Sequence, residues 1–383
     1  MGADAAVTIF YLDPETGETY PLDPPRWASS RRRPLLLTPM PGIGRAEIET
    51  GTASLWRYRA ALPLADAAPV SMGEGMTPLI ERRLDGATAL LKCEWLMPTG
   101  SFKDRGASVM LSLLRGQGIE AVLEDSSGNG GAAIAAYAAA GGMAATILAP
   151  AATSPAKLVA MRACGARVEL VPGDRQATAA AALARADTVF YASHNWHPFF
   201  LHGTKTLAYE LWEQLGFRAP DNVIVPCGAG SNVLGLAIGF GELRRAGEIA
   251  VLPRIFAVQP ANCAPVAAAF LAGADARVPT PILPTIAEGT AIAAPIRLRT
   301  VLEVLRESAG GAVTLTESEI IETTFDLARS GLFVEPTAAQ GAAAFRRLIG
   351  ARTIAPGAAT VVVLTGSGLK AATRIAELLE GRS

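Results

Sequence analysis

At residues 98–106 the chain reads Pro-Thr-Gly-Ser-Phe-Lys-Asp-Arg-Gly, a Gly-Ser turn that leads into a helix-favouring segment at 106–114. Lys103 is the chemically notable residue of this stretch. A lysine attacks a carbonyl only as the neutral amine, so a reactive lysine must lose its usual charged, solvated state. We take Lys103 as the candidate for covalent capture of a carbonyl compound. The alternative is an ordinary solvated charge at a helix start.

Two loops rich in glycine, serine and asparagine follow Lys103. Residues 126–131 come after the strand-like segment 121–125, and residues 228–232 come after the strand-like segment 222–226. Free N–H groups and positive partial charge at a helix N-terminus bind phosphate and carboxylate. One lysine and two such loops therefore predict a site for an anionic carbonyl cofactor.

Each loop also has a simpler explanation when it is taken alone. Serine and asparagine are favoured before helices for purely structural reasons, so residues 126–131 could be an ordinary turn. The second loop could suggest dinucleotide binding, but Val233 stands where the third glycine of that motif belongs. The order of the segments is more informative than any one of them.

In this order the segments resemble the tryptophan-synthase-β-like (fold type II) family of pyridoxal-phosphate enzymes, and within it the threonine synthases. The matching segments are residues 73–79, 98–106, 126–129, 228–232, 333–336 and 364–370. Several motifs in a fixed order are far more specific than a single motif. The resemblance runs from about residue 56 to about residue 372 and so covers most of the chain.

The resemblance implies pyridoxal 5′-phosphate as the cofactor and a role for each matched residue. Lys103 would hold the cofactor through its amine and then move protons as the catalytic base. The implied cofactor-binding residues are Lys103, Asn129, Gly228, Ala229, Gly230, Ser231, Asn232 and Thr365. Asn129 would contact the ring 3′-oxygen and Thr365 the pyridine nitrogen, although Thr365 could simply end a buried strand. A hydroxyl at that nitrogen suits elimination and replacement better than transamination.

The substrate is expected to bind between the first loop and a histidine-rich segment. Ser126, Ser127 and Gly128 would hold the substrate carboxylate at a helix start. His194 and Asn195 would contact the substrate from a wall of the cleft. The alternative for their segment is a packed aromatic linker between lobes.

All three histidines, His194, His197 and His202, lie within residues 193–203. Imidazoles cluster at zinc and iron sites, so a metal site is an alternative. The spacing fits no single helical face, Pro198 should interrupt any helix, and the segment lacks a carboxylate or a cysteine. We therefore predict no metal.

The match to threonine synthases is weakest at the substrate phosphate. Phe200 stands where these enzymes carry a phosphate-binding arginine, and Gly130 stands where they carry a threonine. Loss of a guanidinium should weaken recognition of a dianion. The histidines, protonated below about pH 6.5, or Lys205 or Lys157 could replace it.

The predicted function is accordingly a lyase of threonine synthase type, which by resemblance converts O-phosphohomoserine to threonine. The alternatives are a threonine/serine or hydroxyaspartate ammonia-lyase and a non-catalytic protein that binds pyridoxal phosphate. Lys103, Asn129 and Thr365 are all present, which argues against the non-catalytic alternative.

Strand-like and helical segments alternate along most of the chain. The strand-like segments are 121–125, 144–149, 166–171, 188–192, 222–226, 254–259 and 360–364. The helical segments are 131–140, 155–164, 176–186, 203–215, 232–245 and 370–380. Such alternation implies parallel sheets covered on both faces, with ligands at the carboxyl ends of the strands. We predict an α/β fold of two lobes, each a largely parallel twisted sheet with helices on both faces, as in fold type II.

The predicted organisation is an N-terminal extension (1–60), a large cofactor-binding lobe (61–95 and 197–383) and a small lobe (96–196). Residues 21–41, rich in proline and arginine, should form an extended arm against a partner or the large lobe. The elements of residues 261–295 cannot be assigned from the sequence.

Composition is typical of an enzyme of two domains and excludes several other classes. A chain of 383 residues, half of them hydrophobic, can bury a sizeable core. A net charge of −1 gives no reason to expect a nucleic-acid or membrane partner. The four cysteines form no C-x-x-C pair and predict reduced thiols. We find no signal peptide and expect a cytoplasmic homodimer that acts on a small amino acid.

Overall fold

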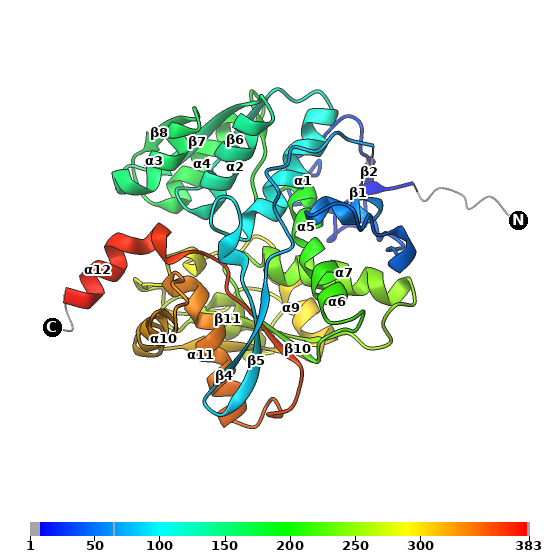
Figure 1. Ribbon diagram of the computed structural model, residues 1–383. Coiled ribbons are helices and arrows are strands. Elements are labelled where there is room, and N and C mark those ends of the chain that lie inside the picture. Colours follow the sequence, from blue (N-terminus) through cyan, green and yellow to red (C-terminus); the bar gives the residue numbers. More distant parts are fainter. Residues whose placement is uncertain (1–7, 64–65, 381–383) are drawn as a thin grey trace, which may run out of the picture.

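The computed structural model describes residues 8–63 and 66–380 and contains two large sheets, one above the other in Figure 1. The lower sheet has the order β12-β11-β10-β13-β5-β4, and only β4 runs antiparallel to its neighbour. Its strands are β4 (Leu79–Leu84), β5 (Ala87–Lys92), β10 (Asn222–Pro226), β11 (Arg254–Pro260), β12 (Gly311–Leu315) and β13 (Thr360–Val363). The upper sheet is entirely parallel.

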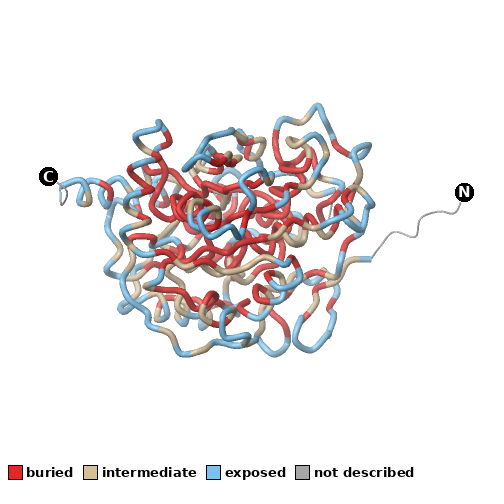
Figure 2. Tube along the Cα trace, turned by 90° about the horizontal axis from the view of Figure 1, so that it is seen from below, coloured by how far each residue is buried: buried red, intermediate tan, exposed pale blue. Residues whose placement is uncertain are grey.

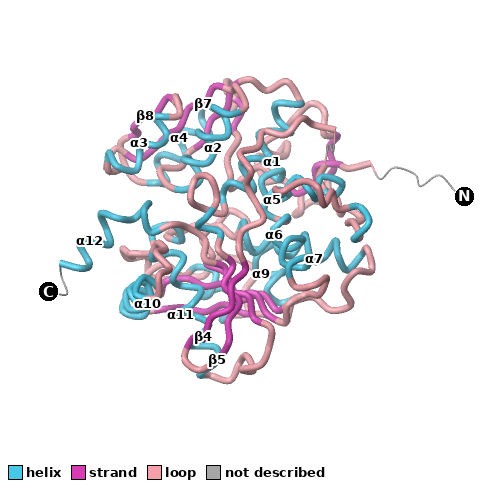
Figure 3. Tube along the Cα trace, viewed as in Figure 1, coloured by secondary structure: helices cyan, strands magenta, loops and turns pink. Residues whose placement is uncertain are grey.

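The upper sheet has the order β8-β7-β6-β9. Its strands are β6 (Ala121–Glu124), β7 (Ala144–Pro150), β8 (Arg167–Val171) and β9 (Phe190–Tyr191). Helices separate the strands of both sheets, as Figure 3 shows. The prediction of an α/β fold with two largely parallel sheets is confirmed.

Alternating side chains of the lower sheet pack against helices on both of its faces. Val223 and Val225 of β10 belong to the core that also includes buried residues of α6 (Thr206–Gln214), α7 (Ser231–Arg245), α8 (Pro265–Leu271) and α9 (Leu298–Glu307). Ile224 points the other way, into the core shared with α10 (Glu317–Arg329) and α11 (Pro336–Gly350). A strand buried on both faces has no polar side, which explains the continuous apolar pattern of β10.

The upper sheet follows the same rule with shorter strands. Val122 packs in the core that contains residues of α1 (Lys103–Gly116), α2 (Asn129–Ala140) and α3 (Pro155–Ala163). Leu123 packs in a smaller core with Ala182 of α4 (Arg175–Arg185). Figure 2 shows the buried residues gathered in the middle of the molecule and the exposed ones around it.

The N-terminal extension is folded rather than an extended arm. Strands β1 (Phe10–Leu12), β2 (Thr19–Pro21) and β3 (Leu36–Leu37) form a small antiparallel sheet of order β2-β1-β3. Its buried Tyr11, Tyr20 and Leu35 lie in the same core as α1 and α2. The expectation that residues 21–41 lie against the large lobe or a partner is therefore corrected, because their apolar side chains pack mainly on the upper lobe.

One predicted helix is in fact two. Residues 203–215 were expected as a single helix, but α5 (Pro198–Thr204) and α6 are separate helices. Pro198 occupies the first turn of α5 and so starts the helix instead of interrupting it. The first turn has no internal acceptor for its N–H groups, so proline costs nothing there.

Helix α5 joins the two lobes. Phe199 and Phe200 belong to the upper core, and Leu201 belongs to the lower core. The predicted lobe boundaries near residues 96 and 197 stay a prediction. The remaining elements are α12 (Ala372–Glu380) and five short 3₁₀ helices: η1 (Arg45–Glu47), η2 (Leu55–Ala61), η3 (Glu94–Leu96), η4 (Glu288–Thr290) and η5 (Gly368–Ala371). Within residues 8–63 and 66–380, no helix combines the length and the apolarity needed to cross a bilayer.

Two glycines allow α1 and α5 to cross at close range. A Cβ on Gly106 would lie 2.5 Å from the ring of Phe200, and a Cβ on Gly203 would lie 2.1 Å from the carbonyl oxygen of Arg105. Any side chain at either position would push the helices apart. This crossing fixes the start of α1, and therefore Lys103, between the two sheets.

Candidate active site

Lys103 is the first residue of α1 and is half-buried. Its Nζ makes no hydrogen bond or ion pair with any described residue, and it lies 4.8 Å from the ring centre of Phe102 and 5.6 Å from that of Phe200. Burial lowers the pKa of Lys103 to about 8, and the charge of Arg175 adds to this effect. An amine with this pKa is partly neutral near pH 7.5 and is therefore nucleophilic.

The charged residues that follow Lys103 anchor the helix start. The Asp104 carboxylate accepts hydrogen bonds from the Thr99 backbone N–H, at 2.7 Å, and from the Thr99 hydroxyl. Arg105 is fully buried and pairs with Glu94 at 2.8 Å and Glu210 at 2.7 Å. Both partners hold the guanidinium on the side away from the cleft. These residues therefore fix the position of Lys103 without contacting a ligand.

Thr365 lies next to the start of α1. The Phe102 backbone N–H donates to the Thr365 carbonyl at 3.0 Å, and Ser101 pairs with Gly366 in an antiparallel bridge. The Thr365 hydroxyl and the Ser101 hydroxyl are buried and have no partner in the described part of the chain. An unpaired buried hydroxyl is costly, so a ligand atom facing Thr365 would satisfy it.

Asn129, the first residue of α2, connects the two lobes. Its Nδ2 donates to the Glu335 carboxylate at 3.1 and 3.3 Å. Glu335 precedes α11 of the lower lobe, and burial raises the pKa of Glu335. The sequence analysis noted Glu335 as part of a matching segment but assigned it no role.

The glycine-rich loop 228–232 lies between β10 and α7. Gly230 has φ +95°, and a Cβ there would lie 2.3 Å from Cγ2 of Val301. A Cβ on Gly228 would lie 3.1 Å from the Gly289 carbonyl oxygen. Both positions therefore require glycine. Ala229 completes the loop, and Ser231 begins α7.

The polar groups of this region fit pyridoxal phosphate. Both side-chain polar atoms of Asn232 are buried and have no partner among the described residues, like the Thr365 hydroxyl. The first N–H groups of α7 point out of the helix start, where they can hold a phosphate. A free amine, an unpaired hydroxyl and this helix start are the groups that an aldehyde, a ring nitrogen and a phosphate need.

His194 and the first loop share one side of the cleft. A Cβ on Gly130 would lie 2.7 Å from the His194 ring and 3.0 Å from the Ser126 hydroxyl. The histidine therefore explains why this position is a glycine and not a threonine. The Ser126 hydroxyl accepts the Gly128 N–H at 3.4 Å, and Ser127 is half-buried beside it. The Asn195 backbone is tied to Arg297, which donates to its carbonyl at 3.1 Å.

The three histidines have different surroundings and do not form one cluster. His194 Nδ1 lies 3.0 Å from the Glu124 carboxylate, and His197 accepts the Phe199 N–H at the start of α5. Burial lowers the pKa of all three histidines, to about 3 for His197. The expectation that they become protonated near pH 6.5 is therefore wrong. Among the described residues, no three metal-ligating side chains are grouped to hold an ion.

The three groups that were considered around the missing arginine are all engaged. Phe200 is fully buried, and its ring centre is 5.7 Å from that of His194. Lys205 is also buried and pairs with Glu242 at 2.7 Å. Lys157 pairs with Glu288 of η4. Neither lysine is free to replace the arginine.

Arg175 and Glu124 are two site residues that the sequence analysis missed. Arg175 is the half-buried first residue of α4, and its guanidinium has no hydrogen bond or ion pair with a described residue. Its charge acts on Lys103 and His194, and it lowers the pKa of Asp125 against the burial that raises it to about 6. The signal was present in the sequence, since two acidic residues directly follow the apolar part of β6.

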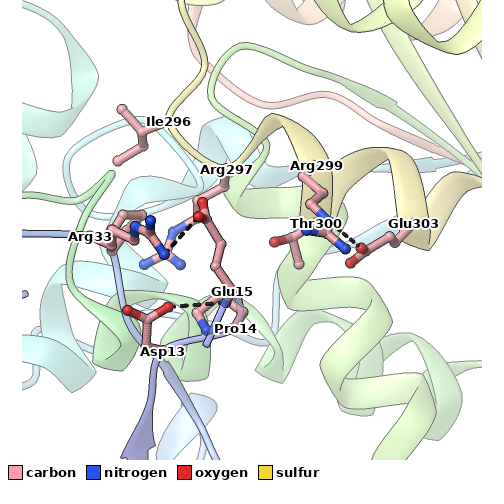
Figure 4. Close-up of a pocket in the computed structure, with 10 residues that line it drawn as sticks. Asp13, Pro14, Glu15, Arg33, Ile296, Arg297, Arg299, Thr300 and Glu303 are labelled. Carbon is pink, nitrogen blue, oxygen red and sulfur yellow. Dashed lines mark hydrogen bonds and ion pairs between the residues drawn. The ribbon is translucent and has the colours of Figure 1, made fainter. Parts of the chain in front are cut away.

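A surface pocket lies away from these residues, between the N-terminal extension and α9 (Figure 4). Its charged side chains are largely paired with each other: Arg33 with Glu15 at 2.8 Å, and Arg299 with Glu303 at 3.0 Å. None of the predicted site residues lines it. The pocket is therefore separate from the cleft around Lys103.

Comparison with known sequences agrees with this geometry. The sequence family described as "Pyridoxal-phosphate dependent enzyme" matches residues 70–366. A threonine synthase of Methanosarcina acetivorans is 31% identical over 88% of this chain and 85% of its own length. A threonine synthase of Methanocaldococcus jannaschii is 35% identical over 86% of this chain and 83% of its own length.

Solved structures share the fold. A bacterial threonine deaminase, from the organism abbreviated T.th., superposes with a TM-score of 0.64 at 28% identity, over 76% of this chain and 92% of its own. A fungal L-serine ammonia-lyase from Rhizomucor miehei has a TM-score of 0.68 at 23% identity, over 80% of this chain and 98% of its own. At that identity the second comparison supports the fold alone.

Proposed function

Because the chain belongs to the family of pyridoxal-phosphate-dependent enzymes, we propose that it catalyses a threonine synthase reaction, from O-phosphohomoserine to threonine. The chain is a pyridoxal-phosphate-dependent lyase similar to threonine synthases. The observation that carries the proposal is the unpaired, half-buried amine of Lys103 at the start of α1, next to the unpaired Thr365 hydroxyl.

The residues of the cleft have separate tasks in this proposal. When bound, pyridoxal phosphate supplies an electron sink for charge that develops at the substrate Cα. Lys103 Nζ takes the proton from Cα and returns it. The N–H groups of 228–232 hold the cofactor phosphate, Asn129 and Thr365 orient its ring, and the 126–128 loop holds the substrate carboxylate.

Arg175 is the residue we propose for the phosphate of the substrate. It has no partner of its own among the described residues, and its positive charge acts on Lys103. A guanidinium binds a phosphate dianion with two parallel hydrogen bonds. Arg175 would thus take over the task for which Phe200 is unsuited.

A second candidate is an ammonia-lyase that acts on threonine, serine or hydroxyaspartate. The buried Phe200 in the arginine position favours it, since a substrate without a phosphate needs no guanidinium there. The similarity to a threonine deaminase is compatible with this activity.

The discriminating experiment incubates the holoenzyme with O-phosphohomoserine, threonine, serine and hydroxyaspartate in parallel. Release of phosphate together with threonine supports the synthase. A 2-oxo acid and ammonia support the ammonia-lyase, and no product from any substrate indicates a non-catalytic protein. Lys103→Ala should lose both the visible absorbance of the bound cofactor and turnover, and a variant that keeps both would contradict the assignment of Lys103.

The Arg175 assignment has its own test. Arg175→Ala should raise the KM for O-phosphohomoserine about ten- to a hundredfold, because one charge-assisted contact is worth about 1.5–3 kcal/mol. Turnover of serine should change little. Arg167→Ala is the matched control, because Arg167 begins the strand before α4 and its side chain is 77% exposed.

We also propose a homodimer located in the cytoplasm. Cys93, Cys164, Cys227 and Cys263 are all free thiols, which suits a reducing compartment. A two-fold symmetric dimer is the commonest assembly of such enzymes. Light scattering on the eluting protein would give twice the 39.7 kDa chain mass if the proposal holds.

A further inference from the structure

We propose that Glu124 and His194 form a second proton-transferring pair in the cleft, in addition to Lys103. Nε2 of His194 would exchange a proton with the oxygen at the substrate side chain, and Glu124 would supply or accept the proton through Nδ1. The inference rests on the proposed function, because it assigns a group to the side-chain oxygen of that substrate.

The first support is the way in which Glu124 holds the imidazole. Glu124 ends β6 and is fully buried, and it accepts hydrogen bonds from the backbone N–H groups of His194 and Asp125, both at 3.0 Å. The Nδ1 atom of His194 lies 3.0 and 3.1 Å from its two oxygens. A carboxylate that accepts from Nδ1–H fixes the tautomer and leaves the lone pair on Nε2.

The second support is that Nε2 of His194 is open. His197 and His202 each have a fully buried ring nitrogen without a partner, whereas no nitrogen of His194 is in that state. Nε2 of His194 also makes no hydrogen bond to a described residue. It is therefore unpaired within the described chain and still accessible to a ligand.

The third support is the position of the ring. It packs against Gly130 and the Ser126 hydroxyl, at the loop proposed for the substrate carboxylate. It also faces Phe200 at 5.7 Å between ring centres, and Lys103 Nζ is 5.6 Å from the centre of the same ring. Lys103 and His194 thus approach the cleft from either side of Phe200.

The proton balance closes in both directions. If a hydroxyl leaves, the C–O bond breaks with both electrons going to oxygen, which takes the Nε2 proton and departs as water. Nδ1 then takes the proton of Glu124, so the pair ends as a carboxylate and a neutral imidazole. If water adds, its oxygen bonds to carbon, its proton goes to Nε2, and the Nδ1 proton returns to Glu124.

The surrounding charges suit a group that titrates near neutrality. Burial raises the pKa of Glu124 to about 7, and the charge of Lys103 acts against this rise. Asp125, which accepts from Tyr191 at 2.7 Å and from Ser193 at 3.3 Å, and Arg175 of α4 are the other charged groups that act on the pair. A general acid or base works best when its pKa is close to the working pH.

The first test uses no turnover. The protein contains three histidines, so ¹⁵N-histidine NMR of the holoenzyme should resolve three rings, and His194→Gln assigns one of them. We expect His194 to carry its proton on Nδ1 above pH 8 and to shift toward the Nε2–H form below pH 6, as Glu124 takes up a proton. A fixed Nε2–H tautomer over this range would overturn the proposal.

The second test measures rates on variants. His194→Gln should lower kcat about 10²–10³-fold, the range for loss of a general acid or base, and should keep the visible cofactor absorbance and nearly the same KM. Glu124→Gln should remove the inflection near pH 7 from the pH profile of kcat/KM. His202→Gln is the matched control, since His202 has no carboxylate partner and should keep the pH profile.

The outcomes separate the two proposals. If the wild-type enzyme turns over a substrate and His194→Gln retains its rate, the proton pair is wrong and the proposed function stands. If the wild-type enzyme is inactive on all four substrates, the proposed function fails and this inference fails with it.

Discussion

At the scale of single residues, the reactivity of Lys103 follows from its surroundings. Nζ lies near two aromatic rings and lacks a hydrogen-bonding partner among the described residues. Desolvation penalises the ammonium form, which is the physical cause of its lowered pKa. The opposing charges of Glu124 and Glu335 are too weak to restore the ordinary value. The amine is prepared for a carbonyl before any ligand arrives.

This state predicts the pH dependence of cofactor capture. Since burial lowers the pKa of Lys103 to about 8, the neutral fraction rises with pH up to about 8 and then levels off. The rate at which the apoenzyme develops visible absorbance with pyridoxal phosphate should therefore rise between pH 7 and 8.5 and be flat by pH 9.5. Pyridoxine phosphate, which lacks the aldehyde, is the control for non-covalent binding. A rate that keeps rising to pH 10.5 would mean that Lys103 is an ordinary lysine.

At the scale of secondary-structure elements, the start of α7 depends on backbone freedom. Gly230 has a left-handed conformation, and its neighbour across the contact is Val301 of α9. An L-residue with positive φ costs about 1–2 kcal/mol. Here the clash with Val301 adds to that strain, and its relief would move the N–H groups that face the cofactor phosphate.

The corresponding prediction compares the two ends of the same helix. Gly230→Ala should weaken binding of pyridoxal phosphate by about tenfold or more, which is at least about 1.4 kcal/mol. Gly247→Ala is the control, because Gly247 has φ +76° near the other end of α7 and open space around its Cβ position. Titration of the apoenzymes with the cofactor measures both affinities. Equal affinities would show that the loop 228–232 does not hold the phosphate.

At the scale of the whole molecule, Arg297 connects three parts of the chain. It precedes α9 of the lower lobe, and it donates to the carbonyls of Leu35 in the N-terminal extension and of Asn195 and Trp196 in the upper lobe. The residue is 4% exposed. A buried guanidinium with several carbonyl acceptors resists loss of either side, because each acceptor would be left unpaired.

Stability measurements on two neighbouring arginines would check this role. Arg297→Ala should lower the free energy of unfolding by about 2–4 kcal/mol, because three buried carbonyls lose a charged donor. Arg299→Ala should change it by about 0.5 kcal/mol or less, since its pair with Glu303 is exposed. Urea denaturation of the three proteins gives the comparison. A similar small loss for both variants would remove Arg297 from the contacts that hold the lobes together.

Much of the architecture could be read from the sequence, because buried parallel strands leave a clear apolar signature. Strand β10 was predicted with its observed ends, residues 222–226. The N-terminal extension was mispredicted because its short strands, such as Leu36–Leu37, carry too little pattern. Pro198 was misread because a proline that starts a helix and one that interrupts a helix look alike in sequence.

The site was less accessible to sequence reasoning than the fold. Lys103 and the two glycine-rich loops stand out because their residue types are unusual for strand–helix junctions. The roles of Glu124 and Arg175 depend on which side chains meet across the cleft, and spacing along the chain carries no such information. The same limit applies to Phe200, whose burial against Gly106 was not visible before the helices were placed.

The contact between Phe102 and Thr365 has a consequence for the order of events during synthesis. These residues lie toward opposite ends of the chain, yet the Thr365 carbonyl helps to fix the turn that precedes Lys103. A ribosome-bound chain that ends before β13 lacks this turn, however well its upper lobe has folded. Capture of the cofactor would therefore report that translation has passed β13 and that both lobes have docked, which makes the colour of the protein a clock for the last step of its folding.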